Sequence, residues 1–172
     1  QSILESVAAD VAPMVGGGRV ANYIPALACI PIQQFGIALH TVDGQQAWAG
    51  DARTPFSIQS VSKVLGLTLA LQALGNTLWE RIGREPSGNA FNSLLQLENE
   101  QGKPRNPFIN AGALCVADRL VSAHIQPAQA FADLGLRLHG KPFVFDDEVA
   151  RSERETGFRN AALINFIKSF KQ

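Results

Sequence analysis

The sequence predicts a mixed α/β (α+β) fold in which helices surround an antiparallel sheet. An Asp43-Gly44 pair separates two short segments that alternate apolar and polar residues, which is typical of a β-hairpin. A long apolar run ends at Gly75, and several segments with helical periodicity follow, separated by Pro, Gly and Asn. The hairpin therefore lies in the first part of the chain, and helices dominate after it.

Each element follows from a local pattern. Residues 2–12 are expected to form an amphipathic helix, because their apolar residues recur at helical spacing until Pro13. Residues 35–42 and 45–49 form the hairpin, whose Asp-Gly pair would supply the positive φ angles of a tight primed turn. The apolar residues 64–74 form a core helix. Further helices are expected at residues 78–82, 91–100, 111–123, 127–139 and 161–170.

The amino-acid composition excludes several classes of function. The 172 residues, 46% of them hydrophobic, suffice for one domain with a sizeable core. Fifteen basic and fifteen acidic residues give zero net charge, which argues against nucleic-acid or anionic-membrane partners. Cys29 and Cys115 are isolated and are predicted to be buried free thiols, which suits a reducing cytoplasm. The histidines, His40, His124 and His139, are scattered and offer no anchor for a Ser-His-Asp triad.

A Ser-x-x-Lys motif precedes the core helix. Ser60 and Lys63 are three residues apart, a spacing that places both side chains on one helical face. Ser60 could then act as an acyl-transfer nucleophile whose proton passes to Lys63. The segment 57–60 also offers hydroxyl or amide N-caps at the start of the helix, where its dipole favours an oxyanion. The competing interpretation is that Ser60 and Ser62 are caps and Lys63 is a solvated side chain.

Five longer motifs carry a resemblance. They are residues 20–27 (VANYIPAL), 55–63 (PFSIQSVSK), 83–93 (GREPSGNAFNS), 105–113 (RNPFINAGA) and 152–160 (SERETGFRN). In this order they strongly resemble the serine-dependent glutaminases, from about Gly17 to the end. The resemblance implies a serine β-lactamase/transpeptidase-like fold and hydrolysis of L-glutamine to L-glutamate and ammonia. It also implies no metal or organic cofactor and a homo-oligomer, and the zero net charge argues against nucleic acid or membrane as partner.

The same resemblance assigns site residues. Ser60 is similar to the nucleophile and Lys63 to its activating base, although Lys63 could instead stay charged and orient Ser60 while a tyrosine outside this chain acts as base. The residues that the resemblance assigns to substrate binding are Tyr23, Gln59, Ser60, Asn110, Glu153 and Asn160. A carboxylate such as Glu153 suits the substrate's α-ammonium, and amide or phenol donors suit its carboxylate. Ser87-Gly88-Asn89 is an alternative β-lactamase-type element, but Asn110 matches the glutaminase pattern better.

The layout also predicts an incomplete sheet. A lone hairpin is marginally stable without more strands, so we expect residues 1–172 to be a single glutaminase domain truncated at its C-terminal side. Without the second oxyanion donor that family members carry further along, such a chain should be nearly inactive alone. The alternatives are a penicillin-recognising serine hydrolase or transpeptidase, which shares Ser-x-x-Lys, and an inert fragment that acts only as an assembly module.

Overall fold

The computed structural model describes residues 1–123 and 125–170. The chain divides into two compact units, and the second begins just before the Ser-x-x-Lys motif. Unit 1 comprises Gln1–Ser57 and Asp146–Thr156, and unit 2 comprises Ile58–Phe145 and Gly157–Gln172. Residues that are distant in sequence thus meet within each unit.

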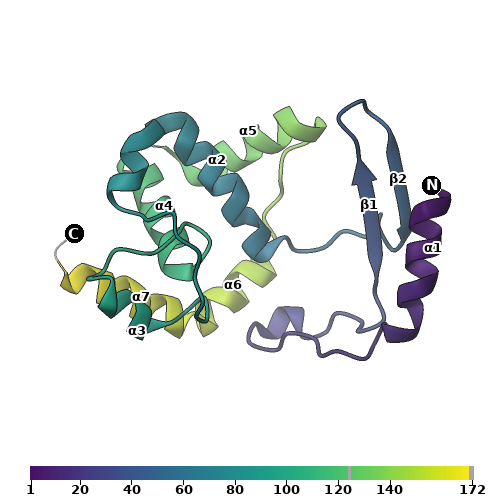
Figure 1. The fold of residues 1–172 in the computed structure, drawn as a ribbon, viewed down its shortest axis with the longest axis horizontal. Coiled ribbons are helices and arrows are strands. Elements are labelled where there is room, and N and C mark those ends of the chain that lie inside the picture. Colours follow the sequence, from purple (N-terminus) through teal and green to yellow (C-terminus); the bar gives the residue numbers. More distant parts are fainter. Residues whose placement is uncertain (124, 171–172) are drawn as a thin grey trace. The chain divides into compact units, whose positions relative to one another are not determined.

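Unit 1 is built on the predicted hairpin. Strands β1 (Gly36–His40) and β2 (Gln46–Gly50) pair antiparallel with Ala38 opposite Trp48, and helix α1 (Ser2–Val11) lies beside them (Figure 1). The side-chain amide of Gln1 donates to Trp48 O at 2.9 Å and accepts from Trp48 N at 3.3 Å. Because one amide satisfies both backbone groups of Trp48, it occupies part of the outer edge of β2 as a strand would. Among the described residues the sheet has these two strands, as predicted.

The hairpin turn differs from the prediction. Gly44 N donates to Thr41 O at 3.0 Å, and Thr41 N donates to Gln45 O at 3.0 Å. Gly44 has a φ of +89°, whereas Asp43 is not in the left-handed region. The loop between the strands therefore holds three residues, in which a regular turn is followed by a left-handed glycine. The prediction of a two-residue primed turn is wrong.

Unit 1 also contains a helix that apolar periodicity does not predict. Helix α6 (Asp147–Thr156) has no buried residue and packs against the 3-10 turn Pro25–Leu27. The Ser152 hydroxyl accepts a hydrogen bond from Ala26 N at 3.1 Å. The Asp146 carboxylate accepts from the backbone N–H groups of Glu148 and Val149 at 3.1 and 3.0 Å, which caps the helix.

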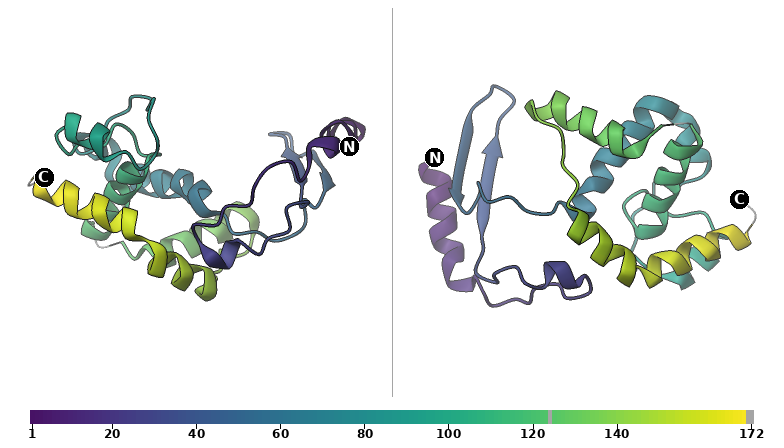
Figure 2. Two further views of the ribbon diagram at one scale, coloured as in Figure 1. Left: turned by 90° about the horizontal axis from the view of Figure 1, so that it is seen from below. Right: turned by 180° about the vertical axis from the view of Figure 1, so that it is seen from behind.

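Unit 2 is a helical bundle around α4 (Asn110–Ser122). This helix contacts α2 (Ser62–Leu74), α5 (Pro127–His139) and α7 (Phe158–Ser169), and it lies between α2 and α7 (Figures 1 and 2). The bundle core contains Leu69, Leu78, Ile82, Leu97, Val116, Leu120, Leu134 and Leu163. The approach at the start of α4 is so close that a Cβ on Gly112 would lie 1.8 Å from Asn106 O.

Several helix predictions need correction. Residues 75–80 form a 3-10 helix where residues 78–82 were expected to be α-helical, α3 covers only Leu94–Asn99, and α7 begins at Phe158. Within unit 2, helix α2 buries only one side: Leu69 and Ala70 are buried, while Val64 and Leu71 are exposed. The expected core helix over residues 64–74 is confirmed on that side, where Leu69 and Ala70 belong to the core of unit 2.

One of the two cysteines is buried and the other is exposed. Both are free thiols, as expected. Cys115 is buried in α4, and burial raises the pKa of its thiol to about 11. Cys29 follows the 3-10 turn of unit 1 and is exposed, with its Sγ donating to Ala26 O at 3.3 Å. The prediction of burial is wrong for Cys29, because a turn on the surface offers no core to cover it.

Candidate active site

Ser60 lies in a 3-10 turn, Gln59–Val61, that leads directly into α2. Its side chain is exposed. The residues in the cap positions before the turn and before α2 are Ile58 and Val61, and neither makes a side-chain cap. The predicted hydroxyl or amide N-cap is therefore wrong at both positions, since these side chains have no polar atom. The competing interpretation of Ser60 as a cap loses its basis.

The residue before Ser60 has an unusual backbone. Gln59 has a φ of +42°, a left-handed conformation that non-glycine residues seldom adopt. Such a conformation costs of order 1–3 kcal/mol and persists only where the surrounding structure enforces it, which is common at active sites. The strain falls on a half-buried residue next to the candidate nucleophile, so it supports a functional turn more than an ordinary helix start.

Lys63 is held by two oxygen acceptors. Its Nζ donates to Phe108 O at 2.9 Å and to Asn110 Oδ1 at 2.8 Å. Burial lowers the pKa of the half-buried ammonium, because a less polar environment disfavours the charged form. A neutral amine has two N–H donors and one lone pair. Both acceptors can thus be satisfied by the neutral form, which leaves the lone pair to accept a proton.

Asn110 connects Lys63 to a third side chain. Besides accepting from Lys63, it donates from Nδ2 to Asn160 Oδ1 at 3.2 Å, and its backbone N donates to Phe91 O at 2.8 Å. It is the first residue of α4, while Asn160 lies in the first turn of α7. Two helices and a loop therefore set the position of one amide group.

The Phe108 carbonyl is fixed by a turn that begins at Asn106. The Oδ1 of Asn106 accepts from Phe108 N at 3.0 Å and from Ile109 N at 3.1 Å, while its Nδ2 donates to Glu85 O at 2.8 Å. Such side-chain to backbone bonds are typical of asparagine in turns. The Asn-Pro pair at residues 106–107 is a turn signal in the sequence, although it does not indicate that Lys63 binds the following carbonyl.

The structure places the remaining predicted residues as follows. Tyr23 and Glu153 lie in unit 1; Tyr23 is 70% exposed, and Glu153 lies on the exposed surface of α6. Gln59 and Ser60 lie in unit 2 with Lys63, Asn110 and Asn160. In unit 2 the contacts directly link Lys63, Asn110 and Asn160. No hydrogen bond joins Ser60 to Lys63 within the described part of the chain.

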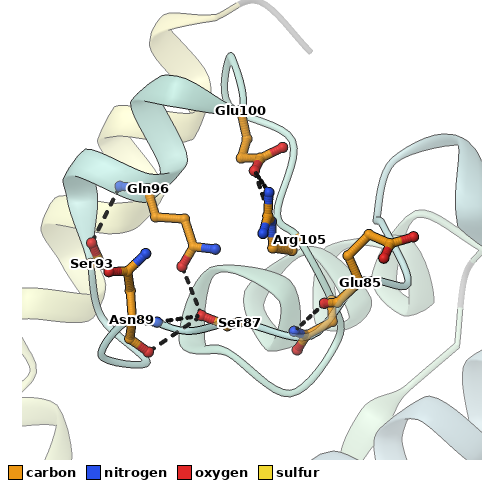
Figure 3. Close-up of polar contacts among 8 residues, drawn as sticks. Glu85, Ser87, Asn89, Ser93, Gln96, Glu100 and Arg105 are labelled. Atoms are coloured by element: carbon orange, nitrogen blue, oxygen red, sulfur yellow. Dashed lines mark hydrogen bonds and ion pairs between the residues drawn. The ribbon is translucent and has the colours of Figure 1, made fainter.

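The alternative Ser-x-Asn element, Ser87-Gly88-Asn89, makes local hydrogen bonds. The Ser87 hydroxyl donates to Gln96 Oε1 at 2.8 Å and accepts from Asn89 N at 3.3 Å (Figure 3). These contacts stay within the loop and the helix that follows it, which agrees with the choice of Asn110 for the site.

The sequence did not indicate two residues that contact Lys63 or Asn110. Phe108 contributes its backbone carbonyl, and Phe91 contributes its carbonyl and its ring. Main-chain groups have no sequence signature.

Other chemistries find little support among the described residues. His40 lies in β1 and His139 in the last turn of α5, where its ring meets Phe143 edge-on at 5.1 Å, and His124 lies outside the described residues. Residues 1–123 and 125–170 contain no group of three His, Cys, Asp or Glu side chains placed to hold a metal ion. Across the same residues, no helix has the length and apolar character needed to cross a bilayer.

Comparisons with known proteins agree on one family. The family model for glutaminase matches residues 18–172. A glutaminase from Azorhizobium caulinodans is 57% identical over 175 residues, which cover 98% of this chain and 55% of that protein. A solved structure of a probable glutaminase from Bacillus subtilis has a TM-score of 0.83 and 34% identity, covering 98% of this chain and 52% of that one.

A further solved structure, of a protein called Mglu in its glutamate form, has a TM-score of 0.85 and 34% identity, covering 98% of this chain and 39% of that one. The chain thus spans about half the length of the curated relatives that it matches. Helices with a small antiparallel sheet match part of the glutaminase fold, which is of the serine β-lactamase-like class.

Proposed function

Because the chain belongs to the glutaminase family, we propose that the protein hydrolyses the side-chain amide of L-glutamine to give L-glutamate and ammonia. The observation that carries the proposal is the environment of Lys63. Its amine lies one turn after an exposed serine, is held by two neutral acceptors, and has a pKa that burial lowers. A Ser-x-x-Lys acyl transfer needs a base near the serine that can be neutral, and these features of Lys63 support that role.

The reaction then has two steps. Ser60 Oγ bonds to the carboxamide carbon of glutamine while its proton passes to Lys63 Nζ. The C–N bond breaks, ammonia leaves with the proton from Lys63, and a γ-glutamyl ester remains on Ser60. Water attacks this ester, gives a proton to Lys63, and glutamate leaves as the proton returns to Ser60 Oγ. The proton of Ser60 leaves with ammonia, and a proton from the attacking water replaces it on Ser60 Oγ. The protons therefore balance over the cycle, and no redox partner is needed.

Substrate recognition is assigned to the polar residues that the family resemblance indicates. Glutamine carries an α-ammonium and an α-carboxylate; we assign Glu153 to the ammonium and Tyr23, Gln59, Asn110 and Asn160 to hydrogen bonds with the rest of the substrate. The contacts of Asn110 support its part. It uses one of its two Nδ2 hydrogens on Asn160, so the second remains to donate to a substrate oxygen. Mglu was solved in a glutamate form, the product expected here.

A matched pair of serine variants tests the reaction. In protein expressed from the full coding sequence, Ser60→Ala should lower ammonia release from glutamine by at least about 10³-fold, because no acyl-enzyme can form. Ser62→Ala, in the first turn of α2, should keep most of the activity. Substantial turnover by the Ser60 variant, with an unchanged circular dichroism spectrum, would refute the nucleophile assignment. No ammonia release by the parent protein would favour the assembly module instead.

The proposal extends to the location, assembly and domain organisation of the protein. We place the protein in the cytoplasm because it has two free thiols, and we expect a homo-oligomer and a single glutaminase domain that includes residues 1–172. Cell fractionation and light scattering on the purified protein test the first two. Limited proteolysis tests the third, since separate domains would give a stable fragment cut near residue 57 or 146.

A further inference from the structure

A polar cluster holds the loop of residues 85–93 at its centre. Gln96 is only 6% exposed, and its Oε1 accepts a hydrogen bond from Ser87 Oγ at 2.8 Å. Its backbone N donates to Ser93 Oγ at 3.2 Å, where Ser93 caps α3 (Figure 3). The Nε2 of Gln96 has no hydrogen-bond partner among the described residues, so the bond from Ser87 to Oε1 and the Ser93 cap are the contacts that tie the loop to α3.

The start of the loop is held separately. Glu85 N donates to Arg105 O at 3.0 Å, and Glu85 O accepts from Asn106 Nδ2 at 2.8 Å. The side chain of Arg105 pairs with Glu100, with Nη2 and Oε1 2.6 Å apart (Figure 3). A Cβ on Gly83 would lie 2.5 Å from Arg105 O, so the backbones approach very closely there. The start of the loop is therefore fixed against residues 105 and 106, in the segment that leads to Phe108.

Phe91, near the end of this loop, contacts two of the proposed site residues. Its carbonyl accepts from Asn110 N at 2.8 Å, and the centre of its ring lies 5.4 Å from Lys63 Nζ. The ring is 61% exposed, so burial contributes little to its position. An ammonium within about 6 Å of an aromatic face is attracted by the negative charge of that face.

We propose that Phe91 is a positioning residue of the proposed glutaminase reaction: its ring stabilises Lys63 when Lys63 takes the proton of Ser60, and its carbonyl fixes Asn110. The inference rests on the proposed function for its catalytic consequence, whereas the contact itself does not. Positive charge develops on Nζ as the proton arrives. It then faces Phe108 O, Asn110 Oδ1 and the ring, all uncharged. Within the described residues burial alone shifts the pKa of Lys63, with no contribution from a carboxylate or a second cation.

The ring and the burial act in opposite directions. Burial lowers the basicity of Lys63, and the ring raises it by favouring the protonated amine. Replacing the ring with an aliphatic side chain of similar size keeps most of the burial and removes this attraction. A cation–π contact at an exposed site corresponds to a pKa change of about 0.5 unit, so Phe91→Leu should lower the pKa of Lys63 by about that much.

The pKa of Lys63 can be measured without any enzymatic assay. The rate at which an amine-reactive acylating reagent modifies Lys63, followed by mass spectrometry of the peptides across a pH series, reports the fraction of neutral amine. Phe91→Leu should shift this titration down by about 0.5 pH unit, and Phe91→Trp should shift it up, because tryptophan binds cations better than phenylalanine. Phe91→Tyr should match the parent. Phe145→Leu removes another exposed phenylalanine of unit 2 and is the control.

The outcomes are distinct. Opposite shifts in the Leu and Trp variants support the proposal, and unchanged or parallel shifts overturn it. If the enzyme is active, the acid limb of kcat/KM for glutamine should move with the Lys63 titration, and the plateau should fall severalfold in the Leu variant with little change in KM. If the kcat/KM plateau falls while the acid limb of the pH profile stays at the same pH, the ring is merely structural. Opposite titration shifts in a protein that releases no ammonia would preserve the contact and refute the proposed reaction.

Discussion

Replacing Asn110 with aspartate tests whether the site depends on a neutral Lys63. The substitution keeps the size and shape of the side chain and turns the Oδ1 that accepts from Lys63 into part of a carboxylate. The two atoms are 2.8 Å apart. A negative charge at that position favours the ammonium form of Lys63, so its pKa should rise where burial now lowers it.

The size of the effect follows from the distance. Two unit charges 2.8 Å apart attract by about 6 kcal/mol at an effective dielectric constant of about 20. Lys63 is half-buried, and solvent weakens the attraction, so a rise of about 1–3 pKa units is expected. If Lys63 must be neutral to accept the proton of Ser60, kcat/KM at pH 7 should fall by about 10- to 1,000-fold.

The assay is the pH profile of ammonia release from glutamine, together with acylation of Lys63. In Asn110→Asp both should rise at higher pH than in the parent, and raising the pH should recover part of the activity. Asn160→Asp is the comparison: it keeps the acceptor for Asn110 Nδ2 and adds a charge beyond Asn110, so its shift should be smaller. A uniform loss of activity with an unmoved acid limb would refute the role of Lys63 as base and leave Asn110 as a substrate ligand alone.

Three further substitutions address the base, the substrate head group and the packing. Lys63→Arg should be as damaging as Lys63→Ala, because arginine stays protonated and cannot accept the serine proton; substantial kcat in the arginine variant would make Lys63 an orienting charge. Glu153→Gln should raise KM for glutamine by a factor of roughly 30 to several thousand, the loss of about 2–5 kcal/mol from a charge pair. An analogue without the α-ammonium should lose much less, and equal losses would show that Glu153 is structural. Gly112→Ala should destabilise the fold by about 1–3 kcal/mol or more in urea unfolding, since its Cβ would meet Asn106 O. Gly88→Ala, where a Cβ meets nothing within 4 Å, is the control, and equal stability of the two variants would contradict the packing argument.

The elements that the sequence predicts best are those with an apolar stripe. Helix α5 matches its predicted bounds, α1 ends one residue earlier than predicted, and α4 begins and ends one residue earlier than predicted. Helix α6 was missed because it has no apolar stripe and is stabilised locally. Its signals were present nonetheless: Asp146 at the N-cap, two acidic residues in the first turn and Arg154 in the last. Charge pattern and capping identify a polar helix that hydrophobic periodicity overlooks.

The hairpin shows a different limit. The Asp43-Gly44 pair correctly located the turn, but the number of loop residues depends on which strand residues pair. With Thr41 opposite Gln45, one left-handed residue suffices, and glycine provides it. Turn type is decided by strand register, which the dipeptide alone does not specify.

The candidate site shows what local sequence can and cannot indicate. The spacing of Ser60 and Lys63 predicted a nucleophile and a base on one helical face, but the acceptors that hold Lys63 come from residues 108 and 110, which are brought near by tertiary packing. Asn110 was expected to contact substrate, and the structure shows that its amide already bonds Lys63 and Asn160. In the proposed reaction, its remaining N–H would donate to substrate while its oxygen faces the base. Substrate binding and the protonation of Lys63 would then be coupled through one side chain.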